Sequence, residues 1–66
     1  MTFQQLQYLI EAQKAGSISQ AAKNLFVTQS SVSIALSALE KELGFPIFIR
    51  SKKGLTPTPR GAAIIE

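Results

Sequence analysis

The sequence predicts a mainly α-helical fold, in which three helices are followed by a two-stranded β-ribbon and the start of a fourth helix. Two observations indicate this fold. Up to Leu43, apolar residues recur at the spacing of three and four that is typical of helices with one buried face. After Gly44, a short aromatic and β-branched run is followed by turn residues, a pattern typical of strands.

Length and composition limit the possible functions. The 66 residues are 45% hydrophobic, which favours one small folded domain over a disordered chain. The chain has no Cys and no His, so disulfides and the usual zinc ligand sets are excluded, and we expect no metal or other cofactor. The start of the chain does not have the features of a secretory signal, and the longest uncharged run, 24–39, is too short and polar to span a bilayer. We therefore expect a soluble intracellular domain with no membrane partner.

The net charge of +3 lies near the carboxyl end of the chain. Three lysines and three glutamates cancel in residues 1–42, whereas residues 43–66 carry four basic residues and one acidic residue. Such an excess attracts a polyanion. The alternative is a solvated basic loop, and the position of these residues relative to the helices must decide between the two.

The first helix is predicted over Phe3–Ala15. Thr2 and Gln5 have the spacing of a capping box, and Gly16 is a typical stop. We expect its main apolar face to consist of four large residues: Phe3, Leu6, Leu9 and Ile10. A weaker stripe on the opposite side, which could receive another helix, consists of Tyr8, Ala12 and Ala15.

A second, short helix is expected between Ser17, which could form another capping box with Gln20, and Phe26. Its buried face should consist of Ile18, Ala21, Ala22 and Leu25, with Val27 inserted into the core at the following corner.

Thr28 then caps a third helix, predicted over Gln29–Leu43, with Gly44 as its stop. At 100° per residue, its buried seam should consist of Val32, Leu36, Leu39 and Leu43. The opposite, outward face should consist of Ser30, Ile34, Ser37 and Lys41, flanked by Ser31 and Ser33.

The ribbon follows. A strand is expected over 45–50, a turn over 51–54, and a returning edge strand over 55–57, because Pro57 could not lie in a central strand. Thr58 and Pro59 have the pattern of an N-cap and a first helical residue, so a fourth helix should begin at Pro59. This helix is expected to continue beyond Glu66 in a longer protein.

Two short helices with a tight turn and a basic ribbon indicate a winged helix-turn-helix. Serines on the outward face of the third helix would permit close approach to a DNA groove, and their hydroxyls could bond to phosphates or base edges. Gln29 could contact adenine and Ile34 a thymine methyl. The alternatives are a solvated serine face and an ordinary exposed isoleucine.

The ribbon supplies candidate phosphate or minor-groove contacts from Arg50, Lys52 and Lys53. For Arg50 the alternative is that its aliphatic chain packs under the ribbon while its guanidinium group bonds to a backbone carbonyl. For the two lysines it is a solvated loop.

The run SISQAAKNLFVTQSSVSIALSALEKELGFPIFIR, followed by LTPTPRG, resembles the DNA-binding domain of LysR-type transcriptional regulators. The resemblance implies a winged helix-turn-helix over residues 1–58 and, over 59–66, the truncated start of a linker helix that forms a homodimer. It also implies bacterial cytoplasm, double-stranded DNA as partner, and an effector-binding domain outside this chain. The DNA contacts that it implies are Thr28, Gln29, Ser30, Ser31 and Ser33, with Arg50 and the turn lysines. Where many members have a basic or amide residue, this chain has Ile34 and Ala35, so more of the binding should rest on the wing.

Other functions are less well supported by the sequence. An enzyme would need a Ser-Lys or paired-carboxylate site, but no Ser-x-x-Lys occurs and no Gly-rich phosphate loop is present. An RNA-binding sheet would need stacking aromatics. A winged helix that binds only protein remains the alternative to DNA binding, and salt-sensitive binding to duplex DNA would distinguish the two.

Overall fold

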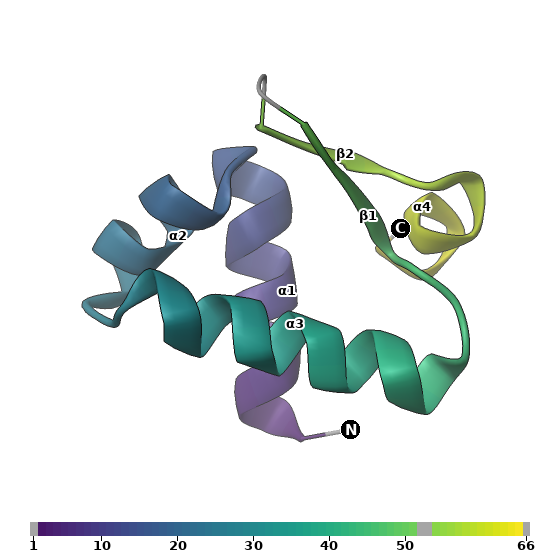
Figure 1. The fold of residues 1–66 in the computed structure, drawn as a ribbon, viewed down its shortest axis with the longest axis horizontal. Helices are drawn as coiled ribbons and strands as arrows, with labels where there is room; N and C mark the ends of the chain where they lie inside the picture. The colour runs from purple at the N-terminus through teal and green to yellow at the C-terminus, as the bar shows by residue number, and fades with distance from the viewer. Residues whose placement is uncertain (1, 52–53, 66) are drawn as a thin grey trace.

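The structure, a computed structural model, describes residues 2–51 and 54–65. Its elements follow the order α1, α2, α3, β1, β2, α4 along the chain (Figure 1). Their bounds are Phe3–Ala15, Ile18–Leu25, Gln29–Leu43, Phe48–Ser51, Gly54–Pro57 and Pro59–Ile65. In Figure 1, α3 runs across α1, and α2 packs near the first half of α3. The ribbon and α4 lie on the opposite side of α1 from α2. The mainly α-helical fold with a two-stranded antiparallel ribbon is confirmed.

The first helix begins and ends where the sequence predicts. The Thr2 hydroxyl accepts a hydrogen bond from the Gln5 backbone N–H, and the Gln5 side chain accepts one from the Thr2 N–H, each at 3.0 Å. Gly16 ends the helix in the left-handed conformation, at φ 74°. Both ends are thus fixed by local interactions.

The predicted buried face of α1 is only half correct, because Leu9 is buried and Leu6 packs against the core as expected, whereas the other two residues do not. Phe3 and Ile10 are 76% and 52% exposed, whereas Tyr8 and Ala12, from the stripe expected on the outer side, lie in the core. Ala15 is half-buried against that core. The physical reason is that α2 and α3 both pack on this side of α1, where a small residue such as Ala12 lets the backbones approach closely. The stripe is therefore not a free surface for another helix.

A tight turn joins α2 to α3. The Ser17 hydroxyl caps α2 by accepting from the Gln20 N–H at 3.0 Å, but the Gln20 amide donates to Asn24 at 2.9 Å instead of completing a box. After Leu25 the chain turns at Phe26, whose φ of 59° is the only positive value among the described non-glycine residues. Val27 is half-buried and packs against the core, as expected.

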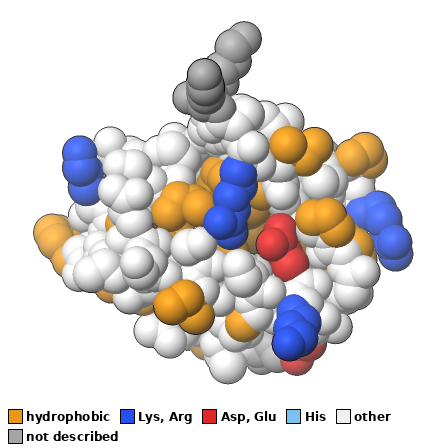
Figure 2. Space-filling model, in the orientation of Figure 1, with side chains coloured by type: hydrophobic (Ala, Val, Ile, Leu, Met, Phe, Trp, Pro, Cys, Tyr) orange, Lys and Arg blue, Asp and Glu red, His pale blue; other side chains and the backbone are white. Residues whose placement is uncertain are grey.

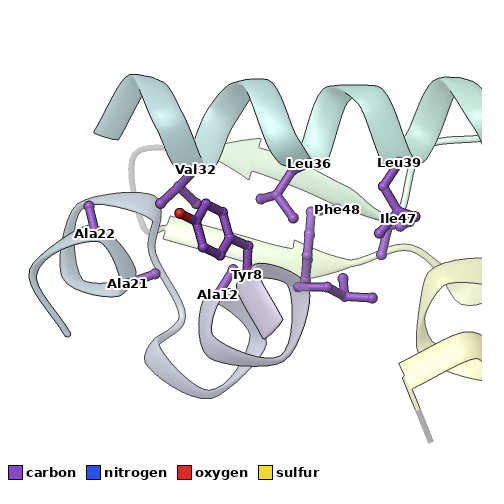
Figure 3. Packing of buried hydrophobic residues seen from close by; sticks show 10 residues of the cluster. Tyr8, Ala12, Ala21, Ala22, Val32, Leu36, Leu39, Ile47 and Phe48 are labelled. Carbon is purple, nitrogen blue, oxygen red and sulfur yellow. The ribbon is translucent and has the colours of Figure 1, made fainter. Parts of the chain in front are cut away.

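The core lies under α3. Figure 3 shows Val32, Leu36 and Leu39 pointing from α3 toward α1 and the base of the ribbon. These three side chains are at most 1% exposed, and Leu43 packs against the same cluster. The predicted seam is confirmed, and it fixes which face of α3 turns outward.

The ribbon begins later than predicted. Its first strand starts at Phe48 rather than Phe45, because the preceding residues do not pair with β2. Ile47, directly before the strand, is fully buried, and its carbonyl accepts from the Thr58 N–H at 2.8 Å. Pro57 is the last residue of β2 and lies opposite Phe48. Thr58 caps α4 through the Gly61 N–H, at 3.0 Å, as the sequence predicts.

Candidate nucleic-acid interface

The outward face of α3 is the main candidate surface. The four residues predicted to point away from the core are all exposed: Ser30, Ile34, Ser37 and Lys41. Ile34 is 69% exposed. Because the first three are small or uncharged, this part of the helix could approach another surface closely.

The hydroxyls at the start of α3 bond mostly to each other. Thr28 caps the helix by accepting from the Ser31 N–H at 3.1 Å, and the two hydroxyl oxygens lie 2.9 Å apart in a further hydrogen bond. The Gln29 amide donates to the Ser19 hydroxyl of α2 at 3.4 Å. Thr28, Gln29 and Ser31 are nevertheless exposed and lie at the same end of the helix.

The ribbon meets α3 through a side-chain contact. Arg50, in β1, donates from Nη1 to the hydroxyl of Ser33 at 3.0 Å. Ser33 is half-buried and Arg50 is exposed. The structure therefore brings these two predicted site residues together, and the Arg50 head contacts a hydroxyl rather than a carbonyl. Lys52 and Lys53 lie outside the described residues.

The ribbon also docks on the turn between α1 and α2. The Leu55 N–H donates to the Gly16 carbonyl at 2.8 Å. Gly54, at φ 116°, lies so close that a Cβ there would collide with the same carbonyl oxygen. The tip of the ribbon thus needs glycine at this position for both space and conformation.

Glu40 is a residue of this arrangement that the sequence did not single out as functional. Glu40, on the ribbon side of α3, accepts hydrogen bonds from the Ile47 N–H at 2.7 Å and the Phe48 N–H at 3.2 Å. A signal was present, because a carboxylate in the last turn of a helix opposes the helix dipole and so suggests another partner.

Three further features of the described residues bear on function: the distribution of charge, the potential metal ligands and the length of the helices. Figure 2 shows the Lys and Arg side chains of one face standing apart, with hydrophobic and acidic side chains between them. Among the described residues, no three His, Cys, Asp or Glu form a group that could hold a metal ion. None of the described helices is long and apolar enough to cross a membrane.

Together, a short helix, a tight turn, a second helix with an exposed polar face and an adjoining antiparallel ribbon define a winged helix-turn-helix, the fold of many DNA-binding domains. The sequence profile of the family described as "Bacterial regulatory helix-turn-helix protein, lysR family" matches residues 3–62. The chain therefore belongs to the LysR family, and the resemblance noted from the sequence is confirmed.

Known proteins support this assignment. The HTH-type transcriptional regulator TfdS of Cupriavidus pinatubonensis is 41% identical over all 66 residues, which cover 22% of its own length. The crystal structure of the CbnR DBD–DNA complex matches 98% of this chain and 75% of its own, with a TM-score of 0.95 and 38% identity. The BenM DBD/catB site 1 DNA complex matches 98% and 73%, with a TM-score of 0.94 and 28% identity.

The chain thus spans about a fifth of the length of the curated relatives it matches. These relatives are transcriptional regulators, which confirms the expectation that this chain is not an enzyme.

Proposed function

We propose that this domain binds double-stranded DNA sequence-specifically, with α3 in the major groove and the ribbon on phosphates or in the minor groove. The observation that carries the proposal is the exposed face of α3, which lies opposite the fully buried Val32 and Leu39. A helix about 10–12 Å across with its side chains fits a major groove about 12 Å wide. The match to the CbnR and BenM DNA complexes supports the same assignment.

We assign direct base contacts to Gln29, at the start of α3, and to Ile34, on its outward face. Gln29 would pair with adenine through its amide, and Ile34 would pack on a thymine methyl. The hydroxyl residues would bind phosphates or base edges: Thr28, Ser30, Ser31 and Ser33. Arg50, Lys52 and Lys53 would bind phosphates beside the groove.

For a longer protein that contains this domain, the family supports three further proposals. Residues 59–66 are the start of a linker helix, through which two copies form a homodimer. A small-molecule effector acts through a domain outside residues 1–66. The protein acts in the bacterial cytoplasm, where its DNA target lies.

The first experiment measures binding of the 66-residue chain to a fluorescent random-sequence duplex over a range of salt concentrations. A logarithm of the affinity that falls linearly with log salt concentration supports the proposal, because phosphate contacts release counterions. No binding at low ionic strength would instead favour a winged helix that binds only protein.

The second experiment tests specificity through Gln29, on a preferred duplex selected from a random pool. Gln29→Ala should weaken binding to that duplex by about 1–3 kcal/mol and to random DNA by much less. Gln13→Ala is the matched control, since Gln13 is an exposed glutamine on α1. Equal losses on both duplexes would make Gln29 a backbone contact and would contradict its role in base recognition.

A further inference from the structure

The ribbon is attached to α3 along one stripe of the helix. Ser33 and Glu40 are seven residues apart, which places them on the same side of α3 and about 10 Å apart along its axis. Ser33 accepts from Arg50, and Glu40 accepts from the Ile47 and Phe48 N–H groups. Ile47 and Arg50 are also about 10 Å apart in extended chain. The start of the ribbon therefore runs antiparallel along this stripe and is held at both ends.

Of the two attachments, the one at Glu40 is the stronger. Its carboxylate binds two successive backbone N–H groups and is partly buried, whereas the Arg50–Ser33 contact is exposed. Phe48 lies opposite Pro57, which has no N–H, and its own N–H donates to Glu40 rather than to β2. The carboxylate thus satisfies the first N–H group of β1, that of Phe48, and the N–H group of Ile47 directly before it.

We infer that Glu40 is a positioning residue for DNA binding, which acts by fixing the angle of the wing, and so of Arg50, relative to α3. The inference rests on the proposed function. The remaining attachments of the ribbon base involve other elements: the buried side chains of Ile47 and Phe48, and the hydrogen bonds of Thr58 to the Pro46 and Ile47 carbonyls. These attachments, with the hydrogen bond from the Leu55 N–H to the Gly16 carbonyl at the ribbon tip, should preserve the fold when Glu40 is replaced. The base of β1 should then lose its fixed position along α3, and the angle of the wing should change.

Charge alone predicts the opposite effect of replacing Glu40. Removing a carboxylate beside a DNA-binding face should tighten binding, because a repulsion with phosphates is lost. If Glu40 positions the wing, Glu40→Ala should weaken binding in spite of this gain. Glu40→Gln should not, since its amide oxygen can still accept both N–H bonds.

The experiment compares dissociation constants of Glu40→Ala, Glu40→Gln and the unaltered chain for a random-sequence duplex at low ionic strength. Glu40→Ala should bind about tenfold more weakly than Glu40→Gln, a typical coupling between groups in contact. Glu42→Ala is the charge-matched control, because Glu42 lies on the other side of α3, in a hollow near Thr2 and Gln5. It should bind at least as tightly as the unaltered chain. Equal affinities of Glu40→Ala and Glu40→Gln would overturn the inference.

A double-mutant cycle separates positioning from a general loss of stability. In the Glu40→Gln background, Arg50→Ala should weaken binding by as much as it does in the unaltered chain. In the Glu40→Ala background its effect should be much smaller, because the wing is already misplaced. The same cost in both backgrounds would overturn the inference. Failure of the unaltered chain to bind DNA would instead overturn the proposed function.

Amide exchange measured by NMR tests the contact itself, and it applies even if Glu40→Ala does not fold. The Ile47 and Phe48 N–H groups should be protected in the unaltered chain and in Glu40→Gln. If both N–H groups exchanged in the unaltered chain at the rate of exposed amides, the inference would be overturned.

Discussion

At the scale of single residues, the hydroxyl groups of α3 differ in what they can offer to DNA. Thr28 and Ser31 bond to each other at the cap. Ser33 accepts from Arg50, so its own hydroxyl proton remains able to donate to a phosphate or to a base acceptor. The side chain of Ser30 makes no hydrogen bond to any residue that the structure describes. Among the hydroxyls assigned to the DNA contact, Ser30 and Ser33 are therefore the best prepared to bond to DNA.

Ile34 gives the first prediction at this scale. Ile34→Arg should change the free energy of unfolding by no more than about 0.5 kcal/mol, because Ile34 is exposed and lies opposite the core seam. Binding to random DNA should strengthen, since a new cation meets phosphates. The fall of log affinity with log salt should become steeper by about one unit. Thermal unfolding and binding titrations at several salt concentrations check both.

The matched control is Ile10→Arg, the same change at an exposed isoleucine of α1. It adds the same charge away from the outward face of α3 and should change the salt slope much less. If both variants strengthened binding equally, the gain would come from net charge alone, and α3 would lose its assigned place in the groove.

At the scale of elements, α4 packs on the ribbon base through Gly61. A Cβ at this position would collide with the Ile47 backbone, so Gly61→Ala should lower the free energy of unfolding by about 1–3 kcal/mol through overpacking. Urea unfolding measures the loss. Gly44→Ala is a useful comparison, because a Cβ at Gly44 would meet no atom within 4 Å, whereas its φ is +85°. Its cost, about 1–2 kcal/mol, would be conformational.

The two causes can be separated by Asn, which tolerates the left-handed conformation. Gly44→Asn should therefore recover part of the loss seen in Gly44→Ala, whereas Gly61→Asn should be at least as damaging as Gly61→Ala. A Gly61→Ala chain as stable as the unaltered one would show that α4 does not pack closely on the Ile47 backbone.

The ends of the helices could be predicted from the sequence because their signals are local. Thr2 and Gly16 fix α1, and Thr28 and Gly44 fix α3, each within one turn of the element it ends. The outward face of α3 was also predicted correctly, since a single leucine-rich seam defines it.

The features that could not be predicted depend on contacts distant along the chain. Both sides of α1 are apolar, so periodicity alone could not show that α2 and α3 would cover Tyr8 rather than Phe3. The start of β1 depends on its pairing with β2. The partners of Glu40 are backbone groups seven and eight residues away, which no side-chain pattern reveals.

The wing gives a second prediction at the element scale. Replacing Lys52 and Lys53 with Gln should weaken binding to all sequences and lower the salt slope by about two units, because two phosphate contacts are lost. Lys14→Gln, in the last turn of α1, is the control that removes one charge elsewhere. It should reduce the steepness of the salt dependence by less than the loss of either wing lysine. An unchanged slope for the double variant would remove the wing lysines from the interface.

At the scale of the whole molecule, the question is which surface joins two copies. The stripe of Tyr8, Ala12 and Ala15 is excluded as a docking site for α4, since the core of the same chain already covers it. α4 itself presents Ala63 and Ile64 to solvent, with Ile64 39% exposed. Because this seven-residue helix is short, its apolar surface alone is too small for a tight dimer.

We therefore predict that the 66-residue chain sediments as a monomer or a weak dimer, and that a chain in which α4 continues for several turns forms a tight dimer. The dimer should bind a palindromic site far more tightly, because two copies of α3 would then reach successive major grooves about 34 Å apart. Ile64→Ser should weaken the longer dimer, whereas Ile10→Ser, at an exposed isoleucine of α1, should not. A tight dimer of the 66-residue chain, dissociated by Ile10→Ser, would instead place the interface on the exposed side of α1.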